Sequence, residues 1–182
     1  MAVHILLMTF LAPVLALAAR RTMRAALAPM NGVLAHVEIA AAVQLAMVWA
    51  WHAPPVLAAA HGSHVLHIAM QAALLASAFW FWASLFAISG NSRWRGIVAL
   101  LFTSKIFCLL GILFLFAPRA LYPGPGSDAA VVADQQAAGL LMLVACPAAY
   151  VLTGIVIAAR WFGDLIEADE KSRTAEQAHA LA

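Results

Sequence analysis

Long apolar runs separated by short polar or turn-forming segments dominate this chain. A helix needs roughly 20 apolar residues to cross the hydrocarbon core of a bilayer, and five runs reach about that length. Apolar residues are continuous within each run rather than alternating, which favours helices over the strands of a membrane barrel. The predicted helices are residues 1–19, 32–51, 64–88, 96–117 and 136–161.

The segments between these runs hold residues that end helices. They are Pro29-Met30-Asn31, Pro54-Pro55 with Gly62, Gly90-Asn91-Ser92, and Pro118 with Pro123-Gly124-Pro125-Gly126. The sequence therefore predicts an all-α, polytopic membrane bundle of about five transmembrane helices over residues 1–162. Residues 163–182 form a charged, alanine-rich tail, which is expected either to continue as a short amphipathic helix or to stay disordered.

Basic residues are concentrated in loops that would share one side of the membrane. Lys and Arg favour cytoplasmic loops. The first loop, the third loop and the C-terminal end together hold eight of these residues. The second loop has none, and the fourth has only Arg119. This asymmetry predicts an external N-terminus and a cytoplasmic C-terminus. The eight are Arg20, Arg21, Arg24, Arg93, Arg95, Arg160, Lys171 and Arg173.

Composition supports a membrane protein and narrows its class. The 182 residues are 65% hydrophobic and 10% charged, against about half and about a quarter in soluble domains. A net charge of +2 gives no reason to expect a nucleic-acid partner. Cys108 and Cys146 lie in apolar runs without a CxxC pair, so no disulfide framework is expected. Arg20-Arg21 follows the first run instead of preceding it, so this run is interpreted as a retained helix and not as a cleaved signal.

Histidines gather on the face predicted to be external. Five of the seven lie there, at the outer helix ends and in the second outer loop, while one lies near the inner end of the second helix and one in the tail. The outer five are His4, His52, His61, His64 and His67; the others are His36 and His179.

Methionines and a carboxylate lie near these histidines on the predicted helices. His4 and Met8 are four residues apart and share a helix face. Asp134 and Met142 are eight apart and are expected to share a helix face as well, with Gly139 between them allowing close approach of a neighbouring helix. Imidazole and thioether together suit copper, since thioethers select Cu(I). The alternative for each residue is structural, because histidines at membrane edges also reach the headgroups and Met also fills gaps in apolar cores.

Two further ionisable residues lie within the predicted membrane segments. Glu38 is in the inner half of the second helix, and Lys105 is near the middle of the fourth. Ionisable groups at such depths usually pair or line a pathway. We expect a Glu38–Lys105 ion pair, with a proton or ion route as the alternative.

Several of these residues fall in motifs that resemble a known family. Met1 to Met8, followed by Ala12-Pro13, is similar to the first segment of CtaG-type cytochrome c oxidase assembly factors, and four such segments occur in order over roughly residues 1–160. The others are Trp51-His52-Ala53-Pro54, His67 as the first histidine of a His-x-x-Glu-His motif, and Leu121-Tyr122 followed by Asp134-Gln135, Gly139 and Met142.

The chain also departs from the family pattern. Met1 takes the position of the first motif's methionine, so the histidine before it is absent and the chain is expected to be an N-terminally shortened member or one whose start was assigned at an internal Met. Met70-Gln71 replaces the Glu-His of the third motif, and His64, one turn before His67, is the expected substitute ligand.

The resemblance implies a non-enzymatic, copper-binding assembly factor. It would be a multi-pass protein of a bacterial inner membrane, would hold Cu(I) at a site facing the periplasm or outside, and would pass copper to cytochrome c oxidase subunits. Membrane lipids are further expected partners, and a homo-oligomer is compatible with the sequence. The expected ligands are His4, His52 and His67, followed by His64, Met8, Asp134 and Met142; Asp134 is alternatively an acceptor that orients a ligating imidazole.

Three other functions stay open. Histidines on facing helices, such as His52 and His67, also ligate haem, which would suit a haem-binding or quinone-binding subunit of a membrane oxidoreductase. A copper permease needs a polar path through the inner half, where only His36, Glu38 and Lys105 are available. The third alternative function is a structural scaffold that binds no metal.

Overall fold

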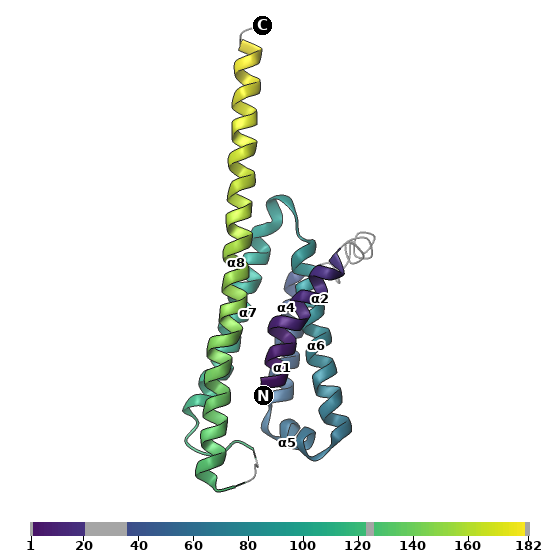
Figure 1. Cartoon of the computed structure of the whole chain (residues 1–182), viewed down its shortest axis with the longest axis vertical. Helices are drawn as coiled ribbons and strands as arrows, with labels where there is room; N and C mark the ends of the chain where they lie inside the picture. The colour runs from purple at the N-terminus through teal and green to yellow at the C-terminus, as the bar shows by residue number, and fades with distance from the viewer. Residues whose placement is uncertain (1, 21–35, 123–125, 181–182) are drawn as a thin grey trace.

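The computed structural model describes residues 2–20, 36–122 and 126–180, and over these residues the chain is helical without strands (Figure 1). The all-α membrane bundle predicted from the sequence is confirmed. The elements are α1 (Ala2–Leu6), the π-helix η1 (Leu7–Leu11), α2 (Ala12–Ala18), α4 (Val37–His52), α5 (Pro54–Gly62), α6 (His64–Ala87), the 3-10 turn η3 (Gly90–Ser92), α7 (Arg93–Phe116) and α8 (Asp128–Ala180).

Length and hydropathy identify the membrane-crossing helices among the described residues. Three are long and apolar enough to span a bilayer: α6, α7 together with η3, and α8. The bent pair α4 and α5 makes a fourth only if the two are counted as one span, and a shorter apolar helix covers Val3–Ala18. Taken in chain order, these helices fall in the five apolar runs predicted from the sequence.

The two ends of the bundle differ in what they carry. The start of α1, the short helix α5 and the connection between α7 and α8 lie at one end, and the chain's C-terminus projects beyond the other (Figure 1). We call the first the α5 end and the second the η3 end, after the turn located there. The distribution of basic residues predicts that the α5 end is external.

A sharp bend separates α4 from α5. Ala53 has extended backbone angles, φ −60° and ψ 130°, because the ring of a following proline disfavours the helical conformation. Pro54 then begins α5, where its missing N–H is tolerated. The two helices meet at 71°, so α4 ends at His52 and α5 turns away across the end of the bundle.

A pair of glycines brings α7 and α8 into close contact. A Cβ at Gly139 would lie 2.7 Å from the carbonyl oxygen of Gly111, and one at Gly111 would lie 3.0 Å from the oxygen of Gly139. Small residues allow membrane helices to approach at their backbones. The close approach expected at Gly139 is therefore present, and α7 is the helix that uses it.

The tail continues α8 as a helix. The sequence predicted a span ending near Trp161, whereas α8 runs for 53 residues to Ala180. Ion pairs one turn apart support the extension: Lys171 Nζ lies 2.6 Å from Glu167 Oε1, and Arg173 lies 2.9 Å from Asp169. Of the two alternatives for the tail, the helix is the one observed.

The expected Glu38–Lys105 ion pair is wrong. Glu38 accepts from Arg95 at 2.6 Å, because α4 and α7 pack side by side and both residues lie at the η3 end. Lys105 lies ten residues further along α7, about 15 Å away, and its side chain is exposed. His36 shares Arg95 with Glu38, its Nδ1 being 3.3 Å from the guanidinium, since His36 precedes α4 with extended angles and does not follow helical spacing.

Some sequence predictions fall outside the described residues. These are the position of Met1, the basic residues Arg21 and Arg24, the loop at Pro29-Met30-Asn31, and the turn residues Pro123-Gly124-Pro125.

Candidate metal centre

Two histidines meet inside the bundle near its α5 end. The ring centroids of His4 and His52 are 5.1 Å apart, with the edge of one ring directed toward the other. Each residue is only 3% exposed. His4 comes from α1, and His52 is the last residue of α4. The two imidazoles therefore meet where α4 ends, just before the bend at Ala53.

A small cavity adjoins the two rings. Its volume is about 10 Å³, which is close to the minimum that holds one water molecule. The walls come from α1, η1, α4, α7 and α8. The lining residues are His4, Ile5, Met8, Val48, His52, Phe107, Met142 and Cys146. We call the potential donors among them, His4, Met8, His52, Met142 and Cys146, the donor cluster.

Hydrogen bonding fixes the tautomer of His52. Its Nδ1 lies 2.7 Å from the carbonyl oxygen of Val48, and because a carbonyl only accepts, Nδ1 carries the proton. Nε2 is then left with a free lone pair, and it is buried without a hydrogen-bond partner. Metal-binding histidines usually donate their other ring N–H to a carbonyl or carboxylate in this way.

His4 makes no hydrogen bond through its ring, whereas His52 makes one. Both of its ring nitrogens are buried and lack a hydrogen-bond partner. Buried polar atoms are nearly always paired, so such atoms call for an explanation, of which a bound ion is one. With His52 Nε2, three buried imidazole nitrogens therefore lack partners, and the two neutral rings offer one lone pair each.

A π-helical segment positions Met8. In η1 each N–H donates to the carbonyl five residues back, as Ala12 does to Leu7. The matching donor for the carbonyl of Met8 would be residue 13, which is a proline and has no N–H. The indole nitrogen of Trp82 donates to this oxygen instead, at 3.1 Å, and so anchors the backbone that carries the thioether.

The sulfur atoms of α8 complete the lining. Met142 and Cys146 are four residues apart and share a face of the helix, and they are 3% and 5% exposed. Gly139, one turn before Met142, brings this face against α7. Cys146 was not among the candidate ligands predicted from the sequence; it is a free, buried thiol.

The chemistry of the donor cluster suits a soft cation. Among the described residues, no group of three or more His, Cys, Asp and Glu side chains is placed to hold a metal ion. An ion bound by the two imidazoles therefore needs thioether sulfur to complete its coordination. Thioethers bind soft ions, whereas carboxylate-rich sites suit hard ones.

His67 lies beside the donor cluster and not in its lining. It is half-buried on α6, a helix that packs against α1 and η1. Its ring stacks on that of exposed His61, with centroids 6.4 Å apart, and its Nε2 lies 3.4 Å from Nε2 of Gln71. His64, by contrast, is exposed at the start of α6.

Asp134 also lies outside the cavity. Asp134 is exposed. Burial raises the pKa of the Tyr122 hydroxyl, and the Asp134 carboxylate adds to this shift. The neighbouring Gln135 is the buried one: its Oε1 accepts from the backbone N–H of Leu121 at 2.8 Å, and its Nε2 donates to the carbonyl of Phe114 at 3.3 Å. Gln135 thus ties the end of α7 and the following connection to α8.

Of the seven residues expected to bind metal, the structure brings four into one cavity and leaves three elsewhere. His4, Met8, His52 and Met142 line the cavity. His67 lies next to it, while His64 and Asp134 are exposed.

Comparison with known proteins yields one match. The sequence model of a family described as cytochrome c oxidase caa3 assembly factor (Caa3_CtaG) matches residues 1–164. No curated protein and no solved structure matches the chain.

Proposed function

The chain belongs to the cytochrome c oxidase caa3 assembly factor family, and from this membership and the buried His4–His52 pair we propose that it binds Cu(I) in the membrane and passes it to the oxidase. The role is binding and transfer, not turnover of a substrate. The observation that carries the proposal is the set of buried imidazole nitrogens without partners around a cavity that also contains thioether sulfur.

In this proposal the two histidines supply the primary ligands. His52 offers Nε2, held in position because its Nδ1 donates to Val48. His4 offers one of its two free nitrogens. Met8 and Met142 line the same cavity and supply the soft ligands that favour Cu(I) over harder ions. Neutral thioethers make the set exchangeable, as delivery requires.

A second histidine pair supports a route between this site and the surface. His61 is exposed, His67 is half-buried, and their rings stack. Because His67 lies on α6, which packs against α1 and η1, copper would move from His61 to His67 and then to the donor cluster. His67, expected from the sequence to be a primary ligand, is here assigned to transfer.

The layer toward the η3 end favours delivery over permeation. One turn along α8 from Cys146 lies Tyr150, whose hydroxyl accepts from Gln44 at 2.7 Å. Its ring packs against Phe81, Trp82 and Phe107. All of these side chains are at most 2% exposed, so a packed layer separates the donor cluster from the η3 end.

The size of the cavity favours an ion over a larger cofactor. About 10 Å³ accommodates a bare ion in place of one water. A haem or a quinone ring needs a site of several hundred Å³, which the space between His4 and His52 does not provide.

Lys105 supplies a candidate contact with the oxidase. It is exposed at the middle of α7 and forms no ion pair within the described residues. A lone ammonium group facing lipid at this depth is costly, by about 2.5–3.5 kcal/mol on insertion scales. We assign it to a partner helix of the oxidase that carries a carboxylate at the same depth.

Anaerobic titration of the purified chain with Cu(I), against a competing chelator, tests the proposal. The wild type is expected to bind one ion per chain, and His4→Ala and His52→Ala are expected to lose it. His179→Ala, in the exposed tail, is the matched control and should bind as the wild type does. Unchanged stoichiometry and affinity in both site variants would reject the site.

A further inference from the structure

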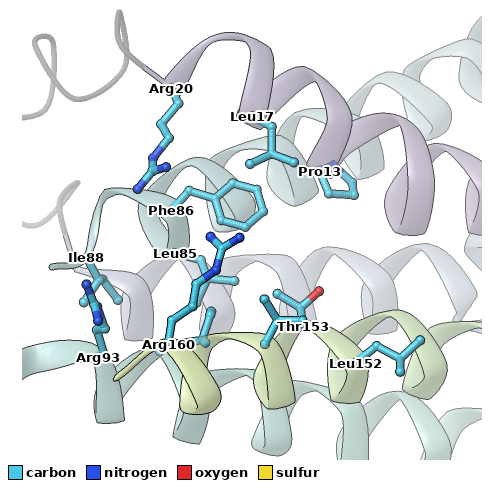
Figure 2. Close-up of a pocket in the computed structure, with 13 residues that line it drawn as sticks. Pro13, Leu17, Arg20, Leu85, Phe86, Ile88, Arg93, Leu152, Thr153 and Arg160 are labelled. Atoms are coloured by element: carbon cyan, nitrogen blue, oxygen red, sulfur yellow. The ribbon is translucent and has the colours of Figure 1, made fainter. Parts of the chain in front are cut away.

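A second, larger cavity lies at the opposite end of the bundle. Its volume is about 420 Å³, within the range of small-molecule sites. It is bounded by α2, α6, α7 and α8, and it is separate from the donor cluster, with which it shares no lining residue. Its lining includes Pro13 and Leu17 of α2, Leu85, Phe86 and Ile88 around the end of α6, and Leu152, Thr153, Val156 and Arg160 of α8 (Figure 2).

Three arginines line this cavity. Arg20, Arg93 and Arg160 come from three different segments of the chain. Arg93 is paired with Asp164, whereas Arg20 and Arg160 form no ion pair within the described residues. The guanidinium groups of Arg20 and Arg160 extend from opposite walls toward the same space beside Phe86 (Figure 2).

Below the arginines both walls are apolar. On α8, Leu152, Val156 and Arg160 follow one another at four-residue spacing, so they form one stripe that begins apolar and ends basic. Pro13 and Leu17 on α2, followed by Arg20 two residues beyond its end, give the same order at spacings of four and three. Each wall therefore presents hydrocarbon toward the middle of the membrane and positive charge at the η3 end.

We infer that this cavity binds an anionic phospholipid. The phosphate would accept hydrogen bonds from Arg20 and Arg160, since the planar guanidinium binds phosphate oxygens in pairs. An acyl chain would follow the apolar stripes of α2 and α8. Basic pockets between transmembrane helices on the cytoplasmic side are typical sites for anionic headgroups, and the η3 end is the one that the basic residues predict to be cytoplasmic.

The packing of α8 against the N-terminal helices leaves space for a lipid at this cavity. Near the α5 end α8 contacts α1 and η1, and it packs on these more closely than on α2. The N-terminal helices α1, η1 and α2 and the helix α8 therefore separate toward the η3 end, where the cavity lies. A lipid bound between them would link the N-terminal helices to α8, which the protein itself connects only weakly there.

Thermal unfolding of the purified full chain, with and without added lipid, tests the inference. Phosphatidylglycerol is compared with phosphatidylcholine of identical acyl chains and with inorganic phosphate. We expect phosphatidylglycerol alone to raise the unfolding temperature of the wild type. Its apparent Kd is expected to rise about fivefold in Arg20→Gln or Arg160→Gln, and about thirtyfold in the double variant. Arg173→Gln, on the same helix beyond the cavity, should bind as the wild type does.

Each other outcome overturns the inference. Equal stabilisation by phosphatidylcholine, whose phosphate is neutralised by its choline group, would remove the requirement for a net negative charge on the lipid, and stabilisation by inorganic phosphate would indicate a free-anion site. An unchanged Kd in the double variant, or an equal loss in Arg173→Gln, would place the lipid elsewhere. If the double variant does not fold, the two single variants decide in the same way. Because copper titration does not involve this cavity, failure here leaves the proposed function standing.

Discussion

The indole N–H of Trp82 donates to the carbonyl oxygen of Met8 across 3.1 Å, joining two residues that are 74 positions apart in the chain. This bond satisfies the one carbonyl of the π-helix that Pro13 leaves without a backbone donor. The first helix thus departs from α-geometry just where it carries a candidate ligand. π-Helical turns are often found at functional sites.

Trp82→Phe should weaken both the fold and the metal site. The variant keeps an aromatic ring and leaves the buried Met8 oxygen unpaired, which costs about 1–3 kcal/mol. We expect a lower unfolding temperature together with weaker Cu(I) binding. Trp94→Phe, at a residue 53% exposed on α7, is the control. If Trp82→Phe unfolds at the wild-type temperature, the bond does not contribute as argued.

Replacing the thioethers separates metal binding from packing. Met8→Leu and Met142→Leu conserve volume and should change stability by less than about 1.5 kcal/mol. Each removes a soft donor, so Cu(I) affinity should fall by at least about tenfold, a loss that even residues orienting a ligand produce. The measurement is chelator competition, with Met47→Leu, 38% exposed, as the control. Wild-type affinity in both variants would restrict both methionines to packing.

The glycine contact between α7 and α8 should tolerate no side chain. A Cβ at Gly139 would lie 2.7 Å from a backbone oxygen and 2.8 Å from a backbone nitrogen, and backbone atoms cannot yield as a flexible side chain does. Gly139→Ala should therefore destabilise the bundle by about 1–3 kcal/mol. In Gly154→Ala the nearest atom would be at 3.8 Å, so this variant should be neutral or more stable. Thermal unfolding in detergent compares the two, and equal unfolding temperatures would show that the helices separate without cost.

Lys105 should matter for the oxidase and not for the isolated chain. Lys105→Leu removes an unpaired charge from the lipid-facing surface, so the purified protein should be at least as stable as the wild type. The amount of oxidase recovered with it should fall. Lys105→Arg keeps the charge and should keep the interaction. Co-purification from membranes provides the measurement, and full recovery with Lys105→Leu would exclude this contact.

Helix content and order were predictable because a bilayer demands long apolar segments. The meeting of His4 and His52 was also within reach of the sequence, since both fall at outer helix ends. Cys146 was not identified because a thiol in an apolar run resembles any other small buried residue. Its relation to Met142 acquires meaning only once that face is known to line a cavity.

Helix rotation accounts for the remaining differences. At about 100° per residue, Asp134 lies about 80° away from the face of Met142, eight residues later, whereas Gln135, seven residues before Met142, lies within about 20° of it. The buried residue is accordingly Gln135 at 2% exposure. Similarly, Glu38 pairs with Arg95 and not with Lys105. The pairing depends on how α4 and α7 are shifted along and rotated about their axes relative to each other, which residue spacing within one helix does not reveal.

The narrowness of the chamber beside His4 and His52 bears on how copper would travel. A space of about 10 Å³ admits a naked ion but neither its water shell nor any fragment of a carrier. Whatever brings the metal must release it entirely at the protein's surface, and whatever collects it must draw it out by exchanging one ligand at a time. A copper ion that is still bound to its carrier would be too large for this site.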